Sequence, residues 1–245
     1  MNTWSINQKI IALWEKERKN KDLINSNFLK RVPQFFIPEC DPAKKSILYV
    51  GLNPSFSDYN FNRVSKKIDD TNPQSVKRFY LWSKEKITRN YLNQLEKINR
   101  EFEEVTYFKK AKKEIANPCN LNLLATDLFL MRETSQKVVK EIIYTTKKQN
   151  ELSSFAKRQI EIFFEIVHTS QPRIILVGNA LASKIIKEYL SLKLLWNDGI
   201  GTYTIKIGRR NIPIFFSGML SGQRALDNHS FERLAWQIKR CVNKK

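Results

Sequence analysis

Polar residues follow the ends of three apolar runs that are typical of buried strands. These residues are Asn53, the pair Thr126 and Asp127, and the stretch from Ser217 to Ser221. In an open parallel sheet, ligands bind beyond the carboxyl ends of the strands. A carboxamide, a carboxylate and several hydroxyl groups at one edge can bind a polar ligand and orient water around it. We therefore expect these three strand ends to form one functional site.

Strand-like runs alternate with helical patterns along the chain. Strands are expected at 46–50, 122–127, 173–178, 202–207 and 212–216. Helices are expected at about 153–168, 179–192 and 230–241. This alternation predicts an α/β fold with three layers (α/β/α), in which helices cover both faces of a mainly parallel sheet. No linker or repeat interrupts the pattern, so residues 1–245 are expected to form a single domain.

Two helical segments add to this plan. The first spans residues 1–40, where Ser5 is expected to cap a helix and Pro33 and Pro38 break the chain. The second is a basic insertion at 60–115, and its residues 61–115 include 14 Lys or Arg against 8 Asp or Glu. Aromatic residues lie among these charges, and most of them are expected to pack the helices together.

Composition narrows the class of partner. The chain of 245 residues carries a net charge of +19, and such an excess attracts polyanions. Three scattered cysteines and two histidines do not predict a metal site, and no cofactor is implied. No apolar run has the roughly 18 residues that a membrane helix needs. A polyanion is therefore the expected class of partner, with no membrane and no obligate protein partner, and a cytoplasmic location is expected.

Three motifs then resemble one family. The segment 50–55 (Val-Gly-Leu-Asn-Pro-Ser) resembles the first motif of uracil-DNA glycosylases, especially the mismatch-specific thymine/uracil and single-strand-selective branches with Gly-x-Asn-Pro. The run 171–180 is similar to the superfamily's Pro-Lys-strand-Gly-x-x-Ala element, and 217–221 stands where the second motif enters the DNA minor groove. The three follow the family order over about residues 40–240. The resemblance implies a monofunctional glycosylase that removes a flipped-out base and leaves an abasic site.

The resemblance also implies roles for individual residues. Asn53 would hold the attacking water through its amide oxygen, whereas efficient relatives have Asp in this motif. Asp127 would be the second catalytic candidate; an ionised Asp only accepts hydrogen bonds, which favours a cytosine-like amine over the O4 of uracil. Asp58 is a further carboxylate in the first loop. The residues expected to bind the base are Gly51, Leu52, Phe56 and Thr126.

Contacts to DNA are expected mainly from the second motif. Met219 and Leu220 form an apolar pair suited to wedge into the gap left by the base. The other expected DNA-binding residues are Ser55, Asn179, Lys184, Ser217, Gly218, Ser221, Gln223 and Arg224. Efficient relatives have a histidine where this chain has Phe216 or Ser217, so stabilisation of the departing base must come from elsewhere. His229 either approaches the site or belongs to a capping turn.

Two alternatives remain open from the sequence. The substrate is either a uracil-like base in DNA repair or a modified pyrimidine, such as a hypermodified cytosine of phage DNA in antiviral defence. The second alternative is that the chain is a catalytically silent DNA-binding module on the same fold. A general nucleotide-binding protein is disfavoured, because neither Gly-x-x-x-x-Gly-Lys nor Gly-x-Gly-x-x-Gly occurs.

Overall fold

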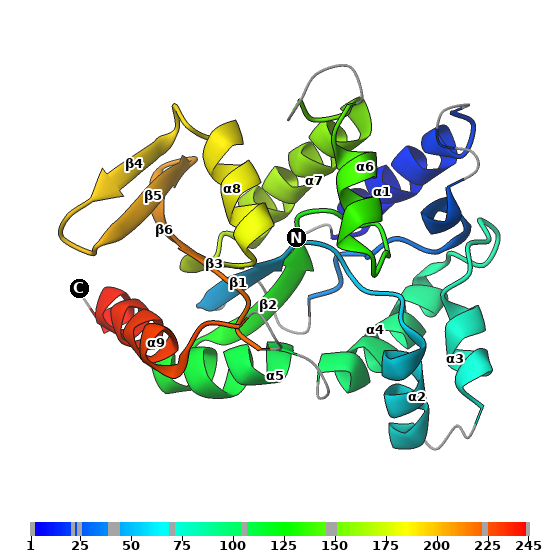
Figure 1. Ribbon diagram of the computed structural model, residues 1–245, viewed down its shortest axis with the longest axis horizontal. Coiled ribbons are helices and arrows are strands. Elements are labelled where there is room, and N and C mark those ends of the chain that lie inside the picture. Colours follow the sequence, from blue (N-terminus) through cyan, green and yellow to red (C-terminus); the bar gives the residue numbers. More distant parts are fainter. Residues whose placement is uncertain are drawn as a thin grey trace. The chain divides into compact units, whose positions relative to one another are not determined.

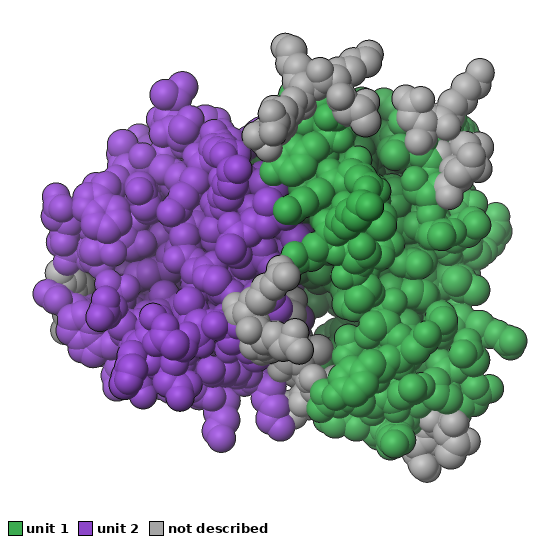
Figure 2. All heavy atoms as spheres, viewed as in Figure 1, with its two compact units in different colours: residues 1–37, 53–105, 127–166 green, residues 38–52, 106–126, 167–245 purple. Residues whose placement is uncertain are grey.

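The computed structural model describes residues 3–20, 23, 26–38, 45–68, 72–103, 107–145, 151–221 and 225–243. The chain divides into two compact units, each built from several segments. Unit 1 comprises residues 1–37, 53–105 and 127–166, and unit 2 comprises residues 38–52, 106–126 and 167–245 (Figure 2). The prediction of one domain over 1–245 stays a prediction, because a compact unit is not by itself an independently folding domain.

Unit 2 contains a six-stranded sheet in the order β2-β1-β3-β6-β5-β4 (Figure 1). Its strands are β1 Ser46–Gly51, β2 Asn122–Asp127, β3 Ile174–Gly178, β4 Leu194–Asn197, β5 Thr202–Ile207 and β6 Arg210–Ser217. β3 runs parallel to both β1 and β6, whereas β5 is antiparallel to β6 and to β4. The predicted α/β class with a mainly parallel central sheet is confirmed.

Helices cover both faces of this sheet. Along β1 and β3 every side chain is buried, as expected for strands that are covered on both sides. One face, with Tyr49, Leu176 and Phe215, joins a hydrophobic cluster with α9 (Asn228–Asn243) and the π-helical turn at Lys112–Ala116. α8 (Ala180–Tyr189) contacts β3 and β6 but contributes no residue to that cluster, so it covers the other face. Unit 2 therefore has three layers.

Gly178 ends β3 where only a glycine fits. A Cβ atom there would lie 2.1 Å from Oη of the buried Tyr49, far inside van der Waals contact. The Tyr49 hydroxyl in turn donates a hydrogen bond to the main-chain oxygen of Gly178 (3.2 Å). This close packing fixes the end of β3 next to Ser217, its register partner on β6.

The predicted elements of unit 2 are confirmed, with two corrections. The expected helix from 179 to 192 ends at Tyr189, and the segment that follows forms β4, a strand that the sequence did not predict. β4 (Leu-Leu-Trp-Asn) is short and mostly exposed and gains its strand geometry by pairing with β5, so three apolar residues in a row did not distinguish it from the end of the preceding helix. The remaining helical segments of unit 2 are α5 Tyr107–Ala111 and the 3₁₀ turn Asn117–Cys119.

Unit 1 is helical. Its elements are α1 Thr3–Glu17, a 3₁₀ turn at Asn27–Lys30, α2 Asp58–Lys67, α3 Pro73–Phe79, α4 Arg89–Glu103, α6 Gln136–Ile143 and α7 Ser154–Ser170, of which α7 belongs to unit 1 up to residue 166. Ser5 lies inside α1, so the predicted cap at Ser5 is wrong. Aromatic rings pack α2 to α4, with Phe61 against both Tyr80 and Phe102. The N-terminal segment and most of the basic insertion thus belong to the same unit.

Candidate functional site

Asn53 lies in the loop after β1, in unit 1, and its carboxamide is fixed by main-chain oxygens. Its Nδ2 atom donates to the oxygens of Pro54 (3.2 Å), Met131 (3.3 Å) and Glu133 (2.6 Å). Only the amide nitrogen can face three carbonyl oxygens, because two oxygens in such contact would repel each other. The orientation of the side chain is therefore determined by its surroundings.

This anchoring leaves the other end of the carboxamide available. Within the part of the chain that the structure describes, no group donates a hydrogen bond to Oδ1 of Asn53. Oδ1 is also not among the fully buried polar atoms that lack a partner. The side chain is half-buried, so Oδ1 is held as an acceptor for a molecule such as water.

Asp127 ends β2 and is buried, with 1% of its surface exposed. Its main-chain N–H donates to Oε1 of Gln34 (2.9 Å). Burial raises the pKa of Asp127 to about 7, against the opposing effects of the Arg132 guanidinium and a hydrogen bond from Gln34. Burial therefore favours the neutral form of this carboxyl group at a higher pH than usual for an aspartate. An ionised Asp127 only accepts hydrogen bonds, whereas the neutral acid both donates and accepts, so the base that Asp127 would read stays a prediction.

Arg132 is a site residue that the sequence did not predict. It is buried, its Nε donates to the main-chain oxygen of Val32 (3.1 Å), and its guanidinium lies 4.5 Å from the ring centre of Tyr80. Buried arginines are rare unless they are paired, and this one acts electrostatically on Asp127. The available signal was a cation directly after the apolar run 128–131.

The segment 131–134 connects these groups within unit 1. Met131 and Glu133 hold Asn53, and Arg132 faces Asp127. The hydroxyl of Thr134 accepts the main-chain N–H of Phe56 (3.1 Å) and shares a hydrogen bond with Ser55 (3.2 Å). This short stretch of chain after β2 thus positions Asn53 and supplies the cation that acts on Asp127.

The ring of Phe56, which was predicted to stack on the base, is already in contact with two other side chains. The guanidinium of Arg31 lies 4.2 Å from the ring centre, and Phe61 packs edge-on at 4.9 Å. Arg31 therefore covers one face of the ring. Asp58 is mostly exposed and pairs with Lys77 (2.8 Å), whereas Ser57 caps α2. These contacts direct neither Phe56 nor Asp58 to a ligand, and the roles of both residues stay predictions.

Gly51, Leu52 and Thr126 lie at the ends of β1 and β2, in unit 2. All three are buried. A base would contact them through main-chain groups at the strand ends more readily than through their side chains. Their base-binding role stays a prediction.

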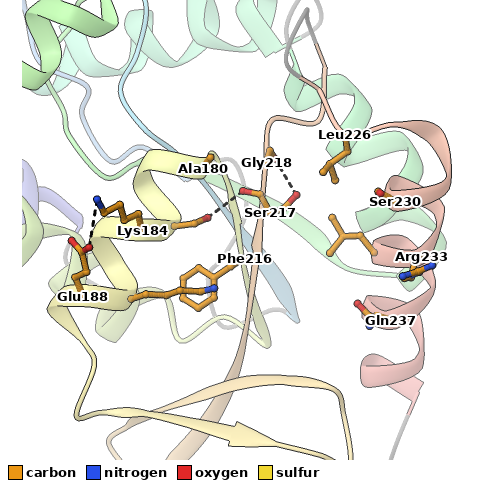
Figure 3. Close-up of a pocket in the computed structure, with 13 residues that line it drawn as sticks. Ala180, Lys184, Glu188, Phe216, Ser217, Gly218, Leu226, Ser230, Arg233 and Gln237 are labelled. Carbon is orange, nitrogen blue, oxygen red and sulfur yellow. Dashed lines mark hydrogen bonds and ion pairs between the residues drawn. The ribbon is translucent and has the colours of Figure 1, made fainter.

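Unit 2 contains a cavity of about 700 Å³ at the carboxyl end of β6. It brings together three predicted DNA-binding residues, Lys184, Ser217 and Gly218. Figure 3 shows Lys184 on α8 on one side, Arg233 on α9 on the other, and β6 between them. Ser217 accepts a hydrogen bond at its main-chain oxygen from Ser183 of α8 (3.1 Å), which ties β6 to that helix. The cavity lies where fold logic places ligands, beyond the ends of parallel strands.

The burial of Leu220 contradicts its predicted role as a side chain that wedges into the DNA. Its side chain is 0% exposed and belongs to the hydrophobic cluster beneath α9. A residue that inserts between bases must be exposed, so Leu220 instead anchors its loop. Met219 and Ser221 are half-buried, and their DNA-binding roles stay predictions. Gln223 and Arg224 lie outside the described residues.

Asn179 and His229 also differ from expectation. Oδ1 of Asn179 accepts the N–H groups of Leu181 (2.9 Å) and Ala182 (3.1 Å), so Asn179 caps α8. The helix N–H groups that were expected to bind a phosphate are therefore occupied. His229 is 94% exposed in the first turn of α9 and lies 3.9 Å from Glu232. Asp227, not His229, accepts the N–H of Ser230 and caps this helix (2.9 Å).

The predicted catalytic residues and the cavity fall in different units, so a common site stays a prediction. No group of three metal-ligating side chains occurs among the described residues. The structure also describes no helix with the length and apolar character required to cross a bilayer. Neither a scan of protein-family models nor a search of curated proteins finds a match to this chain.

Proposed function

We propose that this protein is a DNA glycosylase that hydrolyses the N-glycosidic bond of a flipped-out pyrimidine and leaves an abasic site. One observation carries the proposal: the Asn53 carboxamide is anchored through Nδ2, with Oδ1 held as an acceptor. The resemblance of the Gly-x-Asn-Pro segment to uracil-DNA glycosylases gives this acceptor its role. The α/β sheet and the net charge of +19 support DNA as the substrate, which implies a location with access to DNA, the cytoplasm.

The chemistry follows from the two charges that bond cleavage creates. The sugar becomes positive and the departing base negative, and water then attacks the anomeric carbon. Oδ1 of Asn53 accepts a hydrogen bond from that water and directs its lone pair to the sugar. An amide does not take up a proton near neutrality, so Asn53 orients the water and does not deprotonate it.

Asp127 offers a second function near this loop. The neutral form of its carboxyl group donates a hydrogen bond, and the ionised form accepts one from an exocyclic amine. Since both forms are populated near pH 7, the acid is compatible with a uracil-like base and with a cytosine derivative. The proposal therefore covers a pyrimidine that is either uracil-like or modified, including the hypermodified cytosines of phage DNA.

The test is to incubate the protein with DNAs that each contain one candidate base, followed by mild alkali. Strand breaks at the position of a single base identify the substrate, because abasic sites are labile to alkali. We expect Asn53→Ala to release the base at least about 100-fold more slowly, because loss of one group that stabilises the transition state has an effect of this size. The variant should keep salt-sensitive DNA binding.

A matched control is Asn62→Ala, which removes an exposed carboxamide on α2. This variant should release the base at the normal rate. Base release that is unchanged in Asn53→Ala would remove the catalytic assignment, and breaks that appear with no tested base would argue against glycosylase activity.

A second candidate function is DNA binding without base removal. It is favoured by the burial of Leu220, which leaves no exposed leucine at the wedge position, and by Arg31 covering Phe56. In that case Asn53→Ala would keep every effect of the protein on DNA, whereas loss of basic residues would abolish it.

A further inference from the structure

The cavity of unit 2 contains more binding groups than the sequence indicated. In addition to Lys184, it is lined by Lys187 on α8 and by Ser230, Arg233 and Gln237 on α9. Lys184 and Lys187 lie one turn apart on α8, and Arg233 is the only cation that α9 contributes to the lining, so the sequence does not show that the three belong to one site. Packing of α8 and α9 on opposite faces of the sheet brings the cations to one opening (Figure 3).

The floor of the cavity is an open edge of β6. The register between β5 and β6 ends at the pair Tyr203 and Ile214. Phe216 and Ser217 therefore have β3 on one side and, among the described strands, no partner on the other. This gap beside β6 lets main-chain groups and the Phe216 side chain face the cavity from between the two helices.

The charges of the lining residues favour an anion. Three cations, Lys184, Lys187 and Arg233, stand against one acid, Glu188. Glu188 lies 3.7 Å from Lys184, and both side chains are exposed, so this pair is weak. No described carboxylate pairs with Lys187 or Arg233. Two cations of the cavity are thus available to a ligand.

The remaining walls suit a nucleotide unit. Nζ of Lys187 lies 4.8 Å from the ring centre of Phe216, which holds the ammonium group over an aromatic surface. Leu226 and Leu234 add apolar wall, and Ser230 and Gln237 add hydrogen-bonding groups. A volume of about 700 Å³ lies within the range of sites that bind compact organic ligands. A cation pair beside apolar and aromatic surface is the arrangement by which proteins follow a nucleic-acid strand.

We propose that this cavity binds phosphate groups of a polynucleotide strand, with Lys187 and Arg233 as the principal contacts. The ligand class rests on the proposed function, since DNA is the substrate there; the site itself rests on the cavity and its charges. Under this proposal unit 2 binds the strand, and the principal contacts come from residues outside the three sequence motifs.

The experiment compares two double variants that remove the same charge. Lys187→Gln with Arg233→Gln changes the cavity, and Lys193→Gln with Lys239→Gln removes exposed cations of unit 2 that do not line it. Affinity for a 12-nucleotide single strand is measured by fluorescence anisotropy over a range of salt concentrations. We expect the cavity variant to bind at least tenfold more weakly and its salt slope to fall by about 1.4, roughly 0.7 for each phosphate contact.

The affinity of the control variant for the strand should fall by less than a factor of about two, because exposed charges outside the cavity are screened by salt. Lys187→Arg with Arg233→Lys keeps both charges and should restore most of the binding. Equal losses in the two charge-removing variants would overturn the proposal. Binding of deoxycytidine monophosphate as tight as that of the strand would overturn the assignment to a strand, as would inorganic phosphate competing at micromolar concentration.

The outcome is separable from that of the proposed function. Asn53→Ala changes unit 1 and should leave the strand affinity unchanged while it stops base release. If no DNA base is released by the wild-type protein but the cavity variant still loses strand binding, the cavity assignment holds and the glycosylase proposal fails.

Discussion

Nδ2 of Asn53 lies 2.6 Å from the main-chain oxygen of Glu133, 80 residues further along the chain. This contact joins the loop after β1 to the segment after β2 within unit 1 and decides which end of the carboxamide is presented. With the oxygens of Pro54 and Met131 it accounts for three hydrogen bonds from one NH₂ group. The geometry makes Asn53 a structural residue as well as a catalytic candidate, and the two roles can be measured separately.

Two replacements of Asn53 should destabilise unit 1 to different extents. The difference between them reports which end of the Asn53 carboxamide faces the main-chain oxygens. Asn53→Ala removes the donor and should lower the free energy of unfolding by about 1–3 kcal/mol, because main-chain oxygens lose their partner. Asn53→Asp should cost more at pH 7, since a carboxylate would face carbonyl oxygens. Urea denaturation measures both. An Asp variant as stable as wild type would show that Nδ2 does not face these oxygens.

Asp127 should make stability depend on pH with a defined sign. Its pKa is raised from 3.8 to about 7, so the folded state retains a proton that the unfolded state releases between these values. The free energy of unfolding that this group contributes therefore falls as pH rises from about 4 to about 7, by roughly 4 kcal/mol in total, and is constant above.

The measurement compares wild type with Asp127→Asn by urea denaturation at several pH values between 5 and 8. The stability of wild type relative to the variant should decrease across this range, because Asn cannot ionise. Asp58→Asn, which removes an exposed carboxylate, should show no such trend. A difference that is constant, or that grows towards pH 8, would contradict a raised pKa.

Leu220 should behave as a core residue. Leu220→Ala is expected to lower the free energy of unfolding by about 2–5 kcal/mol, the cost of a buried cavity. Leu192→Ala, at a leucine that is 96% exposed, should change it by less than about 0.5 kcal/mol. If Leu220→Ala kept full stability and lost only base release, the wedge role would be restored.

Asn179 should affect stability more than DNA affinity. Asn179→Ala removes the cap of α8 and should cost about 1 kcal/mol, whereas Asn179→Ser keeps a capping oxygen and should cost much less. Strand affinity should change by less than twofold in both, because the side-chain oxygen is already bound by Leu181 and Ala182. A large loss of affinity at normal stability would support the original DNA-binding assignment.

The sequence by itself determined the class of fold. Buried strands such as β1 and β3 are continuous apolar runs, and the helices between them follow a regular apolar period, so both signals depend only on neighbouring residues. It also located Asn53 and Asp127 at strand ends. It predicted that Lys184 and Ser217 bind DNA, but only the structure shows that both line one cavity. It did not predict β4, because that strand is exposed and depends on its partner β5.

Tertiary structure decided what each of these side chains is able to do. Leu220 is buried by residues that are distant in sequence, and the orientation of Asn53 depends on main-chain oxygens about 80 positions away. The raised pKa of Asp127 follows from its burial, and the joint position of Lys187 and Arg233 follows from the packing of two helices. Burial, hydrogen-bond partners and local charge are set by long-range contacts, which no local pattern of residues specifies.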